Sequence, residues 1–348
     1  MTVNDLQPAW LPPHVRLLGL VAAKWFTQPI YALAKLNIPD LLVAGPRHPD
    51  DLAAAAGVHP DRLRRCLRAA AAVGVFEEDE GGRFGLTEMG QCLRSDQAES
   101  LRDLTVLLGE EPMWESFGDV LETVRTGEPA FSRVHRMDVF DYLAGHPDLS
   151  RVYQGAWATL TSGLAATAVN DFDFARFGHV ADLGGGHGQL LVALLRSYPQ
   201  MTGTLFDRPE VLAQVGPALA REGFGSRLRL VPGLLPGTRP PAADAYVLKN
   251  ILHCFTDASC HDVLRAVREA IGGRQARLLI IEPVLSPGST FDWGKLMDIE
   301  VMINHGGRER TEEEWRDLLS SCGFLLAGAV PATPPHWILE AAPLPDPA

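Results

Sequence analysis

Residues 180–189 read VADLGGGHGQ, and this stretch decides the fold of the second half of the chain. An apolar approach leads to Asp182, an apolar run begins at Leu190, and four glycines lie between them (Gly184, Gly185, Gly186 and Gly188). Glycine adopts positive φ and lets another molecule approach the backbone closely. The free N–H groups at the start of a helix favour an anionic group. The stretch therefore predicts a strand, a tight turn and a helix N-terminus that together can bind a ligand.

The spacing of these glycines separates the possible ligands. A dinucleotide fingerprint requires G-x-G-x-x-G. Counted from Gly184 or from Gly186, the third glycine of that pattern is absent. The residues fit D-x-G-x-G-x-G instead, from Asp182 to Gly188. A turn that only connects a strand to a helix remains the alternative.

Composition places the chain among globular proteins and excludes several classes. Its 348 residues are enough for two domains, with 46% hydrophobic and 21% charged residues. A net charge of −12 disfavours a nucleic-acid partner, which requires a basic surface. The five cysteines form no C-x-x-C pair, which favours reduced thiols in a cytoplasm. We expect no membrane span and no signal peptide, and therefore a cytoplasmic protein.

The N-terminal third has the pattern of a winged helix. Helical spacing of apolar residues over 15–36 gives a broad apolar face, which we expect a partner chain to cover. Prolines open two further helices at Pro49 and Pro60, and a β-hairpin is expected around Gly81-Gly82.

A winged helix can bind DNA, so this alternative needs a test. Four arginines on its second helix favour DNA binding (Arg62, Arg64, Arg65 and Arg68). Residues 77–80 oppose it, because four consecutive carboxylates would face the phosphates. The same fold also serves dimerisation. A regulator that senses a ligand is kept as an alternative, which a DNA-shift assay would decide.

From residue 180 onward, strands alternate with helices, after a mostly helical stretch over 101–168. This order predicts an α/β fold with a mainly parallel, doubly wound sheet and a ligand at the carboxyl ends of the strands. The seven expected strands are Val180–Leu183, Gly203–Phe206, Leu228–Val231, Ala245–Lys249, Arg277–Ile281, Phe324–Ala329 and Trp337–Ala341.

Chemically useful side chains follow several of these strands. Asp207 ends the second strand, where a carboxylate can accept hydrogen bonds from the two hydroxyls of a ribose or can cap the next helix. His253 lies four residues after Lys249, Glu282 ends the fifth strand, and Glu309 precedes a helix. A carboxylate that accepts one imidazole N–H leaves the other ring nitrogen free to act as a base.

Several segments resemble, in order and spacing, the S-adenosylmethionine (SAM)-dependent small-molecule O-methyltransferases of plant phenylpropanoid and bacterial polyketide pathways. The segments are GGGHG, FDRPEV, LKNILHCFTD, LLIIEPVL, LMDIEVM, GGRERT and WILEAAP. The resemblance implies a class I SAM-methyltransferase Rossmann-like domain with a seven-stranded, mostly parallel sheet, preceded by a winged-helix dimerisation domain. It divides the chain into 1–108 for dimerisation, 109–175 as a helical connection lining the substrate pocket, and 176–348 for SAM binding and catalysis.

The same resemblance assigns roles to individual residues. His253 becomes the general base, flanked by Glu282 and Glu309. The implied SAM-binding residues are Asp182, Gly184, Gly186, Gly188, Asp207, Gly233, Leu234, Lys249 and Phe255. Two positions depart from the family: Cys254 replaces an Asp after the histidine, and Leu234 replaces an Asp near the adenine.

The implied reaction is methyl transfer to a phenolic hydroxyl, with S-adenosylhomocysteine as the product and no metal required. The composition is most similar to the actinobacterial branch, which modifies aromatic antibiotic units, so an acceptor of orsellinic-acid type is expected. The implied assembly is a homodimer without nucleic acid or membrane. A SAM-binding relative that performs hydroxylation or decarboxylation is the alternative within this fold.

Overall fold

The computed structural model describes residues 10–97 and 100–345, with backbone alone over 159–167. The chain forms two compact units, one of residues 1–115 with 146–160 and one of residues 116–145 with 161–348. Residues of the connection expected at 109–175 thus belong to both units, and α13 (Pro147–Asp171) runs through both.

The first unit is mostly helical and carries the expected two-stranded hairpin. Its α5 ends at Gly57 with φ +68°, and the Thr87 hydroxyl caps α7 by accepting the Gly90 N–H. Leu33, Phe76 and Phe84 are fully or almost fully buried in its core. The elements are α2 (Pro13–Val21), α3 (Lys24–Lys35), α4 (Ile38–Leu41), α5 (Pro49–Ala56), α6 (Pro60–Ala71), β1 (Phe76–Glu78), β2 (Phe84–Leu86), α7 (Glu88–Gln91), α8 (Arg102–Gly109) and α9 (Glu111–Gly118).

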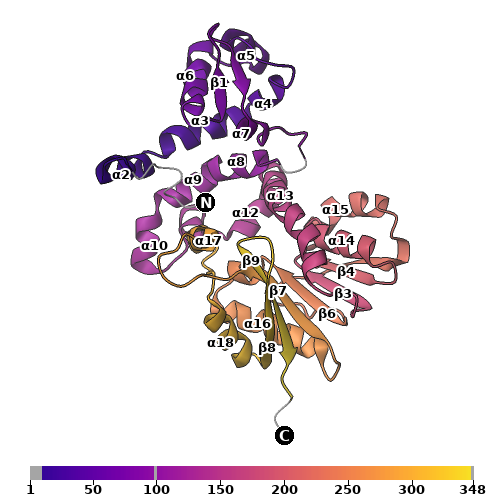
Figure 1. Ribbon diagram of the computed structural model, residues 1–348. Helices are drawn as coiled ribbons and strands as arrows, with labels where there is room; N and C mark the ends of the chain where they lie inside the picture. The colour runs from indigo at the N-terminus through magenta and orange to yellow at the C-terminus, as the bar shows by residue number, and fades with distance from the viewer. Residues whose placement is uncertain (1–9, 98–99, 346–348) are drawn as a thin grey trace. The chain divides into compact units, whose positions relative to one another are not determined.

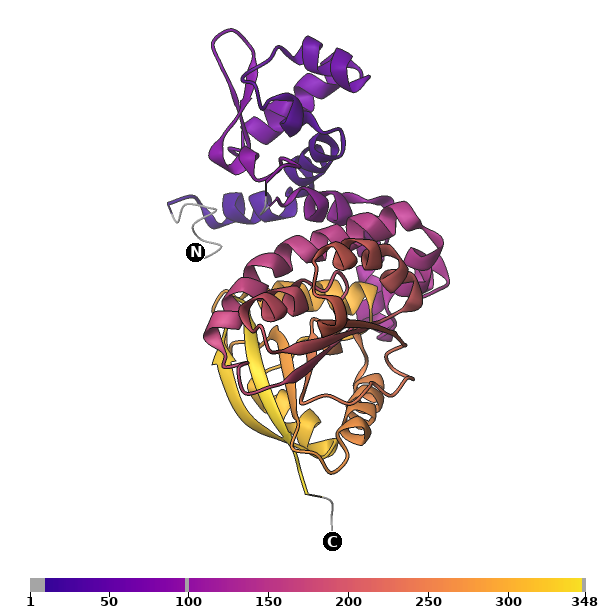
Figure 2. The same cartoon turned by 90° about the vertical axis from the view of Figure 1, so that its right-hand side faces the viewer.

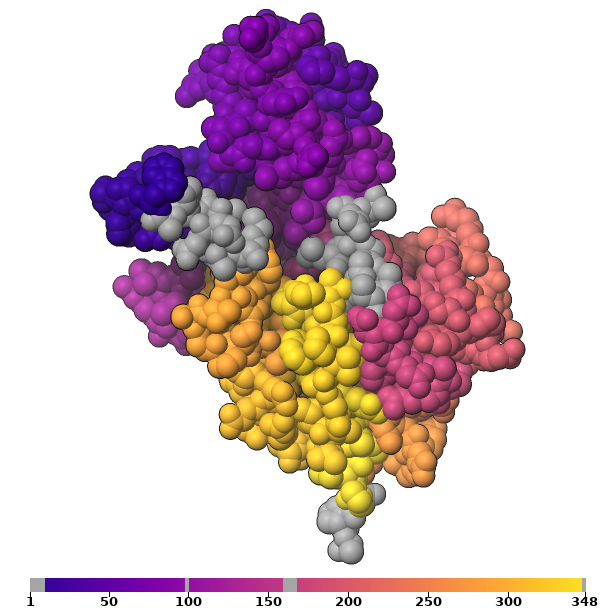
Figure 3. Space-filling view, in the orientation of Figure 1, coloured from indigo at the N-terminus to yellow at the C-terminus, as the bar shows by residue number. Residues whose placement is uncertain are grey.

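The first helix differs from its prediction. The single helix expected over 15–36 is divided into α2 and α3, with a break at residues 22–23. By length and composition Pro13–Lys35 could cross a membrane, contrary to the expectation that no stretch would. Only 11% of its most apolar window is buried within the protein. Apolar side chains on α2 and at the start of α3 are exposed, as in Leu17, Val21 and Trp25, and Figure 3 shows α2 in indigo at the surface.

Charges on the hairpin are partly neutralised within the unit. Glu78 forms an ion pair with Arg68 of α6 at 3.6 Å, and Asp79 pairs with Arg83 at 2.7 Å. An arginine that favoured DNA binding is thus paired with a carboxylate that opposed it, which leaves less basic charge to bind phosphates.

The second unit contains the seven-stranded sheet. All seven predicted strands are present, with bounds that differ by at most two residues at either end. The elements are α10 (Val120–Thr126), α11 (Ala130–His135), α12 (Val139–Gly145), β3 (His179–Leu183), α14 (Gln189–Ser197), β4 (Thr202–Asp207), α15 (Pro209–Arg221), η1 (Gly225–Arg227), β5 (Leu228–Pro232), β6 (Ala245–Lys249), η2 (Leu252–Cys254), α16 (Asp257–Ile271), β7 (Arg277–Pro283), α17 (Trp293–Asn304), α18 (Glu312–Ser321), β8 (Phe324–Pro331) and β9 (His336–Pro343).

The sheet has the order β5-β4-β3-β6-β7-β9-β8. Strands β3 to β7 pair in parallel, whereas β9 pairs antiparallel with both β7 and β8. Figure 2 shows this C-terminal pair in yellow at the edge of the sheet. After β3 the chain continues to β4 and β5 on one side of the sheet, and after β6 it continues to β7 on the other side. The ends of the neighbouring strands β3 and β6 therefore form the switch point where such sheets bind ligands.

Both faces of the sheet are buried. Alternate residues of β6 belong to two cores: Tyr246 and Leu248 pack with α16 and α18, and Ala245 and Val247 pack with α14 and α15. These helix pairs lie on opposite sides of the sheet in Figure 1. Burial on both faces explains why the parallel strands are hydrophobic throughout.

Candidate active site

The turn after β3 has the backbone that its glycines predict. Gly184, Gly186 and Gly188 have φ values of +70°, +56° and +69°. A Cβ added at Gly184 would lie 2.5 Å from Cδ1 of Ile251, so this turn packs against the segment that follows β6. At Gly186 an added Cβ would meet no heavy atom of the described residues within 4 Å beyond its chain neighbours. The turn is thus close-packed at Gly184 and open at Gly186.

Asp207 joins the end of β4 to this turn. Its Oδ2 accepts the Gly186 N–H at 2.8 Å, and its Oδ1 accepts the Arg208 N–H at 2.7 Å. The N-cap of α15 is Arg208, so Asp207 is not the helix cap that the sequence offered as an alternative. Burial raises the pKa of Asp207, against the two backbone hydrogen bonds. Since each carboxylate oxygen has two acceptor sites, both oxygens can still accept a hydroxyl.

Asp182 is buried beneath the glycines. Its side chain is 1% exposed, and neither carboxylate oxygen has a hydrogen-bond partner among the described residues. Burial raises the pKa of Asp182 to about 6, although the charge of Lys249 opposes this shift. A buried carboxylate without partners is costly. Such a carboxylate could hold a positively charged group of a ligand.

The remaining cofactor candidates are distributed around the same edge. Gly233 donates its N–H to the backbone oxygen of Asp207 at 3.0 Å, and an added Cβ there would lie 2.1 Å from Cζ of Phe206. Leu234 is 49% exposed. Burial lowers the pKa of Lys249, against the charges of Asp182 and Glu282. Phe255 follows β6, is half-buried and packs against the core that includes α16.

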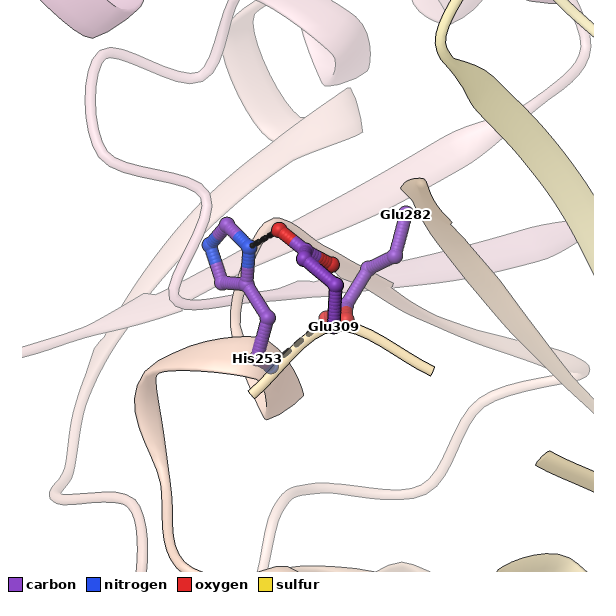
Figure 4. Close-up of side chains that lie close together, drawn as sticks. All are labelled: His253, Glu282 and Glu309. Carbon is purple, nitrogen blue, oxygen red and sulfur yellow. Dashed lines mark hydrogen bonds and ion pairs between the residues drawn. The ribbon is translucent and has the colours of Figure 1, made fainter. Parts of the chain in front are cut away.

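His253 and Glu309 form a buried hydrogen-bonded pair. The imidazole Nδ1 lies 2.7 Å from Oε1 of Glu309, and the two residues are 4% and 2% exposed (Figure 4). Burial lowers the pKa of His253, but the charge and hydrogen bonding of Cys254 and Glu309 outweigh it and raise the pKa well above its ordinary value. The sequence prediction that these two residues meet is confirmed.

Glu282 belongs to the same cluster in a different way. Its Oε1 accepts the N–H groups of Ile251 at 3.0 Å, Leu252 at 2.6 Å and His253 at 3.3 Å. Glu282 thus lies beside His253, with one oxygen within 4.8 Å of a ring nitrogen, and it also holds the backbone of η2 on which His253 lies (Figure 4). Burial raises the pKa of Glu282 to about 6, against the charge of His253.

A second glycine loop brings Glu309 to the histidine. A Cβ added at Gly307 would lie 1.9 Å from the backbone oxygen of His253, so only glycine fits between the two segments. Glu309 is held further by its N–H, which donates to Oδ1 of Asp298 in α17 at 2.8 Å. Sequence analysis missed the role of Gly307, for which the paired glycines of GGRERT were the signal.

Arg310 was also missed. It is 1% exposed, donates from Nη2 to Oδ1 of Asp257 at 2.6 Å and lies 5.0 Å from the ring centroid of Trp315. The positive charge of Arg310 lies close enough to Glu282 to oppose the rise that burial causes in the pKa of that carboxyl. A buried arginine in this position anchors the loop that carries Glu309, and nothing in its spacing distinguished it from the exposed arginines.

The histidine cluster also has the composition of a metal site. One possible ligand atom each from His253, Glu282 and Glu309 lies within 4.8 Å of the others. One oxygen of each glutamate, Oε2, has no hydrogen-bond partner within the described ranges. Imidazole and carboxylate groups are ligands for divalent ions, whereas the Oε1 atoms already bind the ring and the η2 amides. That the reaction needs no metal stays a prediction.

Comparison with known proteins now gives the family. The O-methyltransferase domain model matches residues 114–325, and the O-methyltransferase dimerisation domain model matches residues 18–96. The chain belongs to the O-methyltransferase family. It is a methyltransferase that uses SAM, and the open glycine turn with the unpartnered Asp182 fits that cofactor.

The relatives of this methyltransferase cover 89–99% of its length. It is 38% identical to the phenazine O-methyltransferase PhzM of Lysobacter antibioticus over 99% of this chain and 100% of that protein. It is 39% identical to the 8-amino-8-demethylriboflavin N,N-dimethyltransferase of Streptomyces davaonensis over 89% and 90% of the two chains. The structure of NcsB1 from neocarzinostatin biosynthesis, in complex with SAM and 2-hydroxy-5-methyl naphthoic acid, aligns with a TM-score of 0.80 at 30% identity, covering 92% and 96%.

Proposed function

We propose that this methyltransferase methylates a phenolic hydroxyl of a small aromatic natural-product intermediate of polyketide type, with His253 as the general base. The observation that carries the proposal is the buried hydrogen bond of 2.7 Å between His253 Nδ1 and Glu309. A carboxylate on one ring nitrogen leaves the other as the proton acceptor. Relatives named for phenazine and naphthoate substrates support an aromatic acceptor.

The proton chemistry follows from this pair. With its proton on Nδ1, directed to Glu309, the neutral ring offers Nε2 to the acceptor hydroxyl. A phenol has a pKa of about 10 and needs its proton removed as the oxygen attacks. Glu282 keeps the η2 backbone in place, so the imidazole does not move during the transfer. Bound SAM supplies the electrophilic methyl group.

The chain's own residues must also align the reactants, which supplies much of the rate in such reactions. We assign the amino-acid end of SAM to the turn of Gly184, Gly186 and Gly188 above Asp182, and its ribose to Asp207. The adenine lies near Gly233, Leu234, Lys249 and Phe255 in this assignment.

A methylation assay tests the proposal. The purified enzyme is incubated with SAM and a panel of phenolic polyketide units, including orsellinic acid, and products are measured by mass spectrometry with and without EDTA. We expect one added methyl group on an acceptor oxygen and equal rates in both conditions. Loss of turnover in EDTA with recovery in magnesium would assign the cluster of His253, Glu282 and Glu309 to a metal, and methylation of no phenol would contradict the proposal.

Methylation of an aromatic amine is the second candidate. It is favoured by the 39% identity to a protein named as an N,N-dimethyltransferase. Arylamines in the same panel decide between the two, because an arylamine is uncharged at neutral pH and needs no base before it attacks. An enzyme that methylates amines and tolerates loss of His253 would favour this candidate. The same mass spectra would reveal hydroxylation or decarboxylation, because each of these reactions changes the mass of the acceptor by a different amount from methylation.

We further propose that the enzyme is a cytoplasmic homodimer formed through its N-terminal region. The dimerisation match over 18–96 includes the exposed apolar residues of α2 and α3, such as Leu18 and Trp25. A second copy covering these side chains would remove apolar surface from water. Sedimentation should give a dimer at micromolar concentration, and a monomer would contradict this part of the proposal.

A further inference from the structure

The end of α17 carries a polar atom that the proposed chemistry leaves unused. His305 is the C-cap of this helix, and its N–H donates to the backbone oxygen of Val301 at 2.9 Å. Its ring Nδ1 is buried and has no hydrogen-bond partner among the described residues, which exclude the side chains of 159–167. Leaving such an atom unpaired is costly, and buried polar groups are paired as a rule. The partner of this atom therefore lies outside the described residues.

The surroundings of His305 place this atom at the site. Its ring lies 5.2 Å from that of Phe140 of α12, centroid to centroid, at an angle of 40°. Four residues later the same loop carries Glu309, which holds His253. The charge of His253 is close enough to act on His305, whose pKa falls to about 3 through burial and this charge. The ring is therefore neutral and can accept a hydrogen bond.

We infer that His305 and Phe140 form the subsite for the acceptor ring, in which His305 Nδ1 accepts a hydrogen bond from a second donor group on that ring. The inference rests on the proposed function and narrows its substrate class. Phe140 offers an aromatic surface for the ring to pack against. The preferred acceptors are aromatics that carry a hydroxyl or amino group in addition to the hydroxyl that is methylated.

The tautomer of the neutral ring decides which partner fits, and we assign its proton to Nε2. With the proton on Nε2, Nδ1 accepts and requires an O–H or N–H from the substrate. A hydrogen at that position of the substrate leaves Nδ1 unpaired, and a methoxy group places an acceptor against an acceptor. A site built to pair a polar group discriminates strongly against an analogue without it. His305 is thus a specificity residue, separate from the base that performs the reaction.

Steady-state kinetics on naphthalenes tests the inference. The acceptors are the dihydroxynaphthalene isomers, 1- and 2-naphthol, and the matching methoxynaphthols. For the wild type we expect kcat/KM to be highest for a dihydroxynaphthalene, with the matching naphthol and methoxynaphthol lower by about tenfold to a hundredfold. His305→Phe keeps a ring beside Phe140 and removes both nitrogens, so we expect it to abolish this preference by lowering kcat/KM for the diol far more than for the naphthol.

Matched variants separate recognition from structure. His305→Asn places an amide oxygen near the position of Nδ1 and should restore part of the preference for the diol, and His305→Leu provides a second variant without an acceptor. Unchanged affinity for S-adenosylhomocysteine shows that the cofactor side is intact. Three results would overturn the inference while the methyltransferase assay still succeeds. The first is an equal loss of kcat/KM on diol and naphthol in the His305 variants, and the second is an unchanged preference for the diol in His305→Phe and His305→Leu. The third is a wild-type preference for methoxynaphthols. Failure of the wild type to methylate any phenol would instead overturn the proposed function, and this inference with it.

Discussion

Two glycine loops meet the ends of the same sheet, and they use glycine for opposite purposes. At Gly186, after β3, an added Cβ would meet no heavy atom of the described chain within 4 Å beyond its neighbours, and φ is +56°. At Gly307, before Glu309, an added Cβ would lie 1.9 Å from the backbone oxygen of His253. The first glycine leaves room for a ligand, and the second lets two protein segments come into contact.

In the proposed function, this difference separates cofactor binding from proton transfer. Around the first loop, Asp182 is buried without partners in the described structure, and Asp207 keeps acceptor sites free, so part of the hydrogen bonding awaits a ligand. Around the second loop, the ring of His253 is already fixed by Glu309, and its backbone by Glu282. Substitutions in the two regions should therefore affect different measurements.

The largest expected effect comes from removing the base. His253→Ala should lower turnover by about 10²–10⁴, the usual contribution of a positioned general base. The affinity for S-adenosylhomocysteine should stay within a few fold of the wild type, because the glycine turn is untouched. Kinetics and calorimetry on the same preparation measure both. Near-normal turnover on the true acceptor would show that alignment alone, or an already ionised substrate, accounts for catalysis.

Exchanging the two glycines for alanine tests the comparison directly. Gly307→Ala must push the loop away from His253, so we expect turnover to fall by about tenfold or more and the thermal midpoint to drop, as for other backbone clashes. Gly186→Ala meets open space but puts a Cβ at positive φ, which costs about 1–2 kcal/mol and blocks the ligand's approach. It should chiefly weaken SAM binding. The reverse pattern, with cofactor affinity lost only in Gly307→Ala, would contradict the division of roles.

Asp207 links the turn to the cofactor. Asp207→Ala removes the acceptor of the Gly186 N–H and the proposed acceptor of the ribose hydroxyls. Hydrogen bonds to charged groups contribute about 1.5–3 kcal/mol, which corresponds to a loss of roughly tenfold to a hundredfold in affinity. Calorimetric titration with S-adenosylhomocysteine measures it, and Asp207→Asn, which keeps one acceptor oxygen, should lose less. Unchanged affinity in the alanine variant would remove Asp207 from the site.

The smallest expected effect is a shift in the pH profile. If His253 is the general base that we propose, its reactive form is the neutral ring. The pKa of His253 is raised because Cys254 and Glu309 outweigh burial. Activity should therefore increase with pH, with an inflection above the ordinary value of about 6.5. Glu309→Gln removes a negative charge from Nδ1 and should move the inflection down, whereas Glu282→Gln should move it less, because Glu282 binds the backbone. An equal shift in both variants would indicate that Glu282 acts on the ring.

The sequence by itself determined the architecture and which segments meet at the candidate site. Hydrophobic strands, glycine turns and proline-opened helices are local signals, and they located all seven strands and the two loops. The meeting of His253 with Glu309 was also foreseeable, because both follow elements that end at the same edge of a parallel sheet. Such predictions succeed where a residue's role follows from its own segment.

The tertiary structure alone decided which atoms pair. Glu282 and Glu309 looked equivalent in the sequence, yet one binds three backbone amides and the other binds the ring. Nothing in the spacing distinguished His305 from a surface histidine before α12 placed Phe140 beside it. Hydrogen bonds depend on angles and distances of a few tenths of an ångström. That precision comes from the packing of segments far apart in the chain, which no local pattern encodes.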